Sequence, residues 1–119
     1  MPNFFEVKDK NGIKVYCTKE QWDSHIVLNH SIMSSNVDAV VETIREPDLV
    51  MASHDTNPPL DERRIYTKES TIATYHPKVK YTHVVISICG GSAEVITAYP
   101  NNNKKSGCAE GEAIYVAEE

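Results

Sequence analysis

Residues 80–99, KYTHVVISICGGSAEVITAY, contain two apolar segments on either side of Gly90 and Gly91. Both segments are rich in β-branched and aromatic residues, which are typical of strands, and paired glycines allow the backbone to reverse in a short turn. This stretch predicts an antiparallel hairpin and carries the strongest strand signal in the chain. The fold must therefore be built around a sheet that includes this hairpin.

Other segments have weaker strand patterns. The opening stretch, residues 4–18, has apolar residues on both sides of Asn11-Gly12, a pair that tolerates the positive φ angles of a tight turn, so a hairpin is expected there. Further strands are expected at LVMAS, RRIYTKES, TIATYH and AIYVAEE, residues 49–53, 63–70, 71–76 and 113–119. HDTNPPLDE, residues 54–62, is expected to be a loop, since it combines paired prolines with turn-forming residues.

Two helices are expected between the first hairpin and the sheet. Thr18 and Gln21 form a capping-box pattern, which predicts a helix from about residue 19 to residue 29. A second helix is expected over residues 36–45, with Ser35 and Asp38 as its cap pattern. Its apolar stripe consists of Val37, Val40, Val41 and Ile44, and Pro47 ends it.

These elements predict an α+β fold. An N-terminal hairpin and two helices would pack on one face of an antiparallel sheet of about four strands. With 119 residues and no internal repeat, the chain is long enough for one hydrophobic core and too short for two, so residues 1–119 are expected to form a single domain.

Charge and composition exclude several functions. A net charge of −5 argues against nonspecific coating of nucleic acid, which requires neutralisation of phosphates, but it leaves room for a local basic cleft. No apolar run is long enough to span a membrane, and the opening residues do not resemble an export signal, so a cytoplasmic location is expected. The three cysteines are isolated and are interpreted as plain thiols; Cys17 and Cys89 end apolar strands and are expected in the core.

The segment WDSHIVLNH, residues 22–30, holds two of the five histidines and the only tryptophan. Trp22, His25, Ile26 and Asn29 share one stripe of a regular helix, so His25 is expected on the packed side or at its edge. His30 lies about 140° round the helix from His25, so the two rings can face one site only if the helix ends or bends near Asn29.

The histidines do not have metal-ligand spacing, so neither a metal nor another cofactor is expected. Metal-free acid–base chemistry fits them better. Cleavage of RNA through its own 2′-hydroxyl needs a base, an acid and a group that stabilises the charge on the phosphate. Histidine suits both proton roles because its ordinary pKa of about 6.5 lies near neutral pH. A packing role for His25 is the competing interpretation.

The order of motifs resembles a known family. W-x-x-H-I-x-x-x-H at Trp22–His30 is followed by E-T-I-x-x-P-D at Glu42–Asp48, by a V-V-I strand and by V-I-T-A-Y at Val95–Tyr99. This succession is similar to phage-borne members of the barnase, EndoU, colicin and RelE-like (BECR-fold) nucleases, over roughly residues 16–99. The resemblance implies a metal-independent endoribonuclease whose sheet face forms the RNA cleft.

Carried over residue by residue, the resemblance implies catalytic roles for four residues: His25, His30, Arg64 and Thr97. His25 would act as general base or acid, Thr97 would donate to the phosphate, and Arg64 would be the cation, with Lys80 in reserve. RNA-binding residues would be Tyr99, Lys78 and Lys80. The expected substrate is RNA, with tRNA as a candidate, and a toxin of this kind would need an immunity or antitoxin protein.

Two alternatives stay open. One is a non-catalytic module of the same fold that binds RNA or a protein, which is favoured by Ser31 and Ile32 after His30, where the family often has proline and an acidic residue. The other is an accessory protein that pairs through an apolar sheet face. A monomer or a weak dimer is expected.

Overall fold

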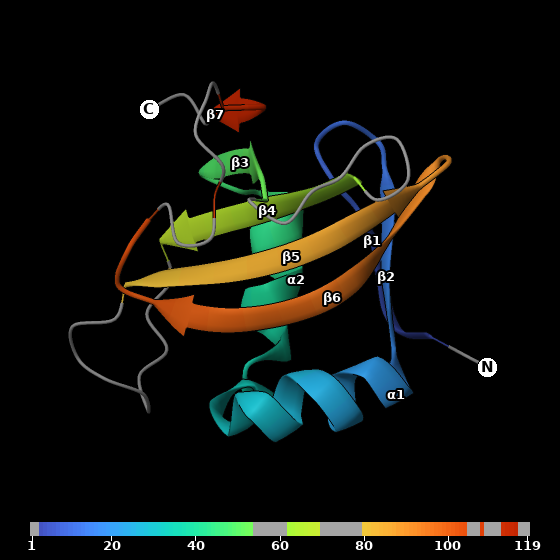
Figure 1. The fold of residues 1–119 in the computed structure, drawn as a ribbon, viewed down its shortest axis with the longest axis vertical. Coiled ribbons are helices and arrows are strands. Elements are labelled where there is room, and N and C mark those ends of the chain that lie inside the picture. The colour runs from blue at the N-terminus through green and yellow to red at the C-terminus, as the bar shows by residue number, and fades with distance from the viewer. Residues whose placement is uncertain (1–2, 54–61, 70–79, 105–107, 109–112, 117–119) are drawn as a thin grey trace.

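The computed structural model describes residues 3–53, 62–69, 80–104, 108 and 113–116, apart from the side chains of residues 32 and 35. The fold is α+β, as predicted (Figure 1). The strand expected over residues 71–76 and nearly all of the loop expected over residues 54–62 lie outside the described residues.

Within the described residues, seven strands form one sheet in the order β1-β2-β6-β5-β4-β3-β7. Their bounds are β1 Asn3–Lys8, β2 Lys14–Thr18, β3 Leu49–Ala52, β4 Glu62–Glu69, β5 Tyr81–Cys89, β6 Ser92–Asn101 and β7 Tyr115–Val116. All neighbouring strands are antiparallel except β2 and β6, which run parallel.

The expected antiparallel sheet of about four strands was therefore wrong in strand number and in direction. The N-terminal hairpin, expected as a separate packing element, extends the sheet by pairing Lys14, Val15 and Tyr16 with Ser92, Ala93 and Glu94. This pairing joins segments more than seventy residues apart, so no local pattern of turns or periodicity could indicate it.

The first hairpin forms at the predicted turn. Gly12 has a φ of 82°, and the Asp9 side chain accepts hydrogen bonds from the backbone N–H groups of Asn11 and Ile13. The other oxygen of this carboxylate accepts a buried hydrogen bond from the Tyr66 hydroxyl in β4. The turn is thus tied to the centre of the sheet.

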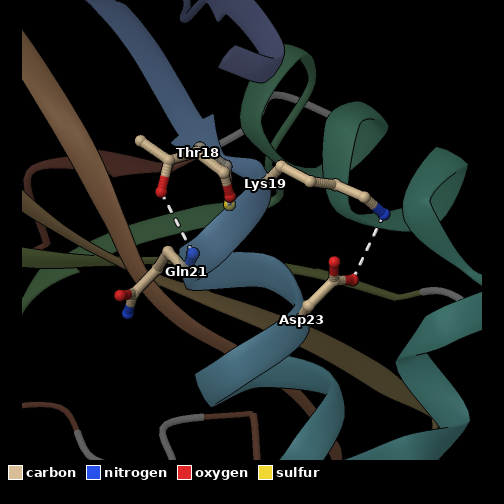
Figure 2. Close-up of polar contacts among 5 residues, drawn as sticks. Thr18, Lys19, Gln21 and Asp23 are labelled. Carbon is tan, nitrogen blue, oxygen red and sulfur yellow. Dashed lines mark hydrogen bonds and ion pairs between the residues drawn. The ribbon is translucent and has the colours of Figure 1, made fainter. Parts of the chain in front are cut away.

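The first helical segment begins at the predicted cap. The Thr18 side chain accepts a hydrogen bond of 3.0 Å from the Gln21 backbone N–H, and Lys19 pairs with Asp23 one turn further on (Figure 2). A single α-helical turn, α1 (Lys19–Gln21), continues into the π-helical turn η1 (Trp22–Val27). Trp22 and Ile26 are buried, whereas His25 and Asn29 are exposed, so His25 does not lie on the packed side, the first of its two expected positions.

The second helix, α2 (Val37–Arg45), follows a 3₁₀ turn, η2 (Ser31–Ser35), and ends just before Pro47 as predicted. The N-cap position is occupied by Asn36 rather than by the predicted Ser35, and the Asn36 side chain makes no capping bond. Figure 1 shows α2 crossing one face of β4, β5 and β6, with the helical segment that starts at α1 beyond β6.

The core lies between α2, the first helical segment and one face of the sheet. Val40 and Ile44 of α2 pack with Trp22 and Ile26 and with buried residues of β2, β4, β5 and β6. Cys17 belongs to this core, as expected, but Cys89 is exposed because it ends β5 at the tip of the hairpin. The opposite face of β5 and β6 carries polar and aromatic side chains, among them the buried His83 and the half-buried Thr97 and Tyr99.

Candidate functional site

A β-bulge in β6 decides which side chains reach the face opposite the core. Thr97 pairs with Val85 and Val95 pairs with Ile86, so Ile96 is an extra residue in β6. Side chains alternate between faces along a strand, and one extra residue reverses that alternation. Val95 therefore points into the core, while Thr97 and Tyr99 lie on the other face, although the three residues occupy alternate positions of one strand.

Four rings form a row on and beside this face. The ring centroids of His30 and Tyr99 lie 5.7 Å apart, those of Tyr99 and His83 lie 5.2 Å apart, and those of His83 and Tyr81 lie 6.4 Å apart. His83 and Tyr99 face each other across β5 and β6 as a register pair. His30 reaches the row from the end of the first helical segment, so the row joins the segment that carries His25 and His30 to the strand that carries Thr97 and Tyr99.

His83 is the innermost member of the row. It is fully buried, and its Nδ1 forms a 2.9 Å hydrogen bond with the Thr67 hydroxyl in β4. Its Nε2 makes no hydrogen bond of normal geometry to a described residue. Burial lowers the pKa of the ring by more than the backbone of Asn103 raises it. Burial lowers the pKa of His83 to about 4. The ring is therefore neutral at neutral pH.

His25 and His30 are close enough to influence each other. Burial lowers the pKa of His30, and the charge of His25 lowers it further. A π-helical turn has hydrogen bonds between residues five apart, the same spacing that separates the two histidines, and the helix ends before His30. The sequence predicted that His25 and His30 could face one site only if the helix ended or bent near Asn29. In the structure, the π-helical turn and the end of the helix before His30 together fulfil this condition.

The structure does not bring the predicted cation to these histidines. Arg64 pairs in register with Ile86, so it lies on the core side of the sheet, opposite to Thr97 and Tyr99. Its guanidinium is bound by Glu62 at 2.9 Å. Lys80 is exposed directly before β5, at the end of the sheet where Tyr81 begins the ring row. Lys78 lies outside the described residues.

Sequence reasoning missed His83 and Gln21. The signal for His83 was the alternation in β5, in which Tyr81, His83 and Ser87 occupy one phase of the strand. Gln21 was interpreted only as part of a capping box, but its side-chain amide donates to the Ile96 carbonyl in β6 instead. That contact joins segments 75 residues apart, so it had no local signal.

Within the described ranges, no group of three or more histidine, cysteine, aspartate or glutamate side chains could hold a metal ion. In the same part of the chain, none of the helices has the length and apolar character needed to cross a membrane. The arrangement instead offers two nearby imidazoles, a half-buried tyrosine and a half-buried threonine, which together can transfer protons and contact a ligand.

The comparisons with known proteins do not define a family for this chain. No family model matches it, and no curated protein or solved structure matches it either. The residues of the site are therefore the basis for the function proposed below.

Proposed function

We propose that this chain is an endoribonuclease that needs no metal and cleaves RNA by attack of the 2′-hydroxyl, with histidine acid–base catalysis. The observation that supports this proposal best is the proximity of His25 to His30 near one helix end, with the ring of His30 next to that of Tyr99. The resemblance to phage-borne BECR-fold nucleases also belongs to the proposal, as do a phage or mobile-element origin and a toxin-like role.

The two histidines would have different proton roles. The lowered pKa of His30 keeps its ring neutral at neutral pH, and a neutral imidazole can accept the 2′-hydroxyl proton. His25 is exposed and would protonate the leaving 5′-oxygen. Thr97 and Tyr99 are half-buried, and they would donate to the phosphate and contact a base, respectively.

The charge distribution argues for a selective substrate. Lys80 is the described basic residue that we propose for the phosphate, because Arg64 lies on the other face. A chain with a net charge of −5 gains little from nonspecific contacts with phosphates. RNA of a defined shape, such as tRNA, is thus the proposed substrate, and a toxin of this type would be controlled by an inhibitor protein.

The test is incubation of the purified protein with total RNA and tRNA in EDTA, followed by analysis of the fragment ends. We expect discrete fragments with 2′,3′-cyclic phosphate ends, and we expect His25→Ala and His30→Ala to reduce the rate by at least about 100-fold. Ser24→Ala, an exposed neighbour on the same turn, is the matched control and should cleave normally. Cleavage that appears only after a divalent metal is added would contradict the mechanism.

A second candidate is a non-catalytic RNA- or protein-binding module. It is favoured by the position of Arg64, which leaves the histidine pair without the cation that the resemblance implied. This alternative predicts that tRNA binds without being cleaved and that His25→Ala binds as tightly as the wild type. A gel-shift titration in EDTA, run beside the cleavage assay, distinguishes the two candidates.

A further inference from the structure

We propose that Gln21 is a positioning residue, which holds the β6 bulge at Ile96 and thereby keeps Thr97 and Tyr99 on one sheet face, with the Tyr99 ring beside His30. Its catalytic consequence rests on the proposed endoribonuclease function; the structural part does not. The contact that carries the inference is the hydrogen bond from the Gln21 side-chain amide to the Ile96 carbonyl oxygen.

The outer edge of β6 explains why this bond is needed. β2 pairs with β6 only as far as Tyr16 and Glu94, so β2 supplies no register partner for β6 beyond Glu94. Ile96 comes two residues later and is also the bulged residue, which a bulge leaves out of the regular ladder. The Ile96 carbonyl therefore needs a donor from outside the sheet, and the Gln21 amide provides it.

The local structure of the first helical segment directs Gln21 to this position. The Gln21 backbone N–H is held by the Thr18 side chain, which fixes the start of the helix directly after β2. Figure 2 shows the Gln21 side chain pointing away from the helix on the side opposite Asp23. Phe4 and Phe5 of β1 pack against Trp22, the next residue, with ring centroids 5.2 and 6.2 Å from its ring. The segment is thus anchored on both sides of the amide.

The bulge has a direct consequence for the site. If β6 had no extra residue, Thr97 and Tyr99 would follow the alternation of Val95 and turn toward the core. With the bulge, Tyr99 contacts His30 and His83 instead. Bulges commonly re-aim side chains next to functional sites, and here one side-chain hydrogen bond from the helix that leads to His25 and His30 stabilises the bulge.

The experiment compares Gln21→Met and Gln21→Asn with the wild type. Methionine keeps the length and helix propensity of glutamine but has no donor, and asparagine keeps the amide but is one methylene shorter. Glu20→Met, at the exposed neighbouring position, is the matched control. The first readout is NMR: the nuclear Overhauser contact between the His30 and Tyr99 rings and the pKa of His30. The second is kcat and KM for the RNA substrate.

In both Gln21 variants we expect the His30–Tyr99 contact to be lost and the pKa of His30 to rise toward its ordinary value, because the ring becomes more exposed. We expect kcat to fall about 10- to 100-fold with a smaller change in KM, since small displacements of catalytic groups reduce rates to this extent. A folded Gln21 variant that keeps both NMR features overturns the positioning role. If the wild type cleaves no RNA, the proposed function fails, and the NMR result alone decides the role of Gln21.

Discussion

The imidazole of His83 stacks on the phenol ring of Tyr99, with ring centroids 5.2 Å apart and ring planes 29° apart. Across the same tyrosine lies His30, which comes from the helical segment rather than from the sheet. Tyr99 therefore links a buried, neutral histidine to the half-buried histidine that we propose as the general base.

His83 makes stability depend on pH in the acidic range. Its pKa is lowered from 6.5 to about 4 in the folded protein, so the unfolded chain binds a proton that the folded chain excludes. The free energy of unfolding contributed by this group is complete above about pH 6.5 and is lost as the pH falls toward 4, by roughly 3 kcal/mol. Urea unfolding between pH 4 and pH 7 measures this slope.

The His83→Phe variant keeps a ring beside Tyr99 but cannot bind a proton. We expect its unfolding free energy to change less between pH 7 and pH 4 than that of the wild type, and the difference should be roughly 3 kcal/mol. His25→Gln, at an exposed position, is the control and should keep the steeper dependence. Equal slopes for His83→Phe and the wild type would show that His83 is not buried as a neutral ring.

The position of Arg64 predicts that it is not the catalytic cation. Arg64 lies on the core side of the sheet and is paired with Glu62. We expect Arg64→Gln to change the rate of RNA cleavage by less than about twofold and Lys80→Gln to reduce it by at least about tenfold. Steady-state cleavage assays on the two variants measure this difference. A larger loss of cleavage rate in Arg64→Gln than in Lys80→Gln would show that Arg64 is the catalytic cation.

The buried bond between Tyr66 and Asp9 fastens the first hairpin to β4. We expect Tyr66→Phe to lower the free energy of unfolding by about 1.5–3 kcal/mol, because the variant leaves a carboxylate oxygen of Asp9 without its donor. Chemical denaturation measures the loss. Tyr16→Phe, a half-buried tyrosine in β2, is the control. Equal stability of the two variants would mean that the Tyr66 bond contributes nothing.

The N-cap at Thr18 should be measurable by itself. Thr18→Ala removes the acceptor for the Gln21 backbone N–H, so we expect a loss of about 1 kcal/mol in unfolding free energy, whereas Thr18→Ser keeps the acceptor and most of the stability. Thermal unfolding followed by the fluorescence of Trp22 reports the change close to the cap. If alanine and serine gave the same stability, the hydroxyl would have no capping role.

Several elements could be predicted from residues that are neighbours in the chain. The turn at Gly12, the helix start at Thr18 and the helix end before Pro47 depend on backbone angles and local hydrogen bonds, and all three are present. The candidate site was harder to predict. His25 and His30 came from a motif, but the exposure of His25 follows from the π-helical turn, which simple helical periodicity does not indicate.

Turn chemistry, capping and apolar periodicity act over a few residues, so the α+β class, both hairpins, the start of the first helix and the end of the second could be predicted from the sequence. Contacts between distant segments set the parallel pairing of β2 with β6, the bulge at Ile96 and the separation of Arg64 from Thr97. These features arise from pairing between segments far apart in the chain. One unpaired residue in β6 is enough to change which side chains share a face. Its position depends on how β6 pairs with β5, so the sequence of β6 alone does not determine it.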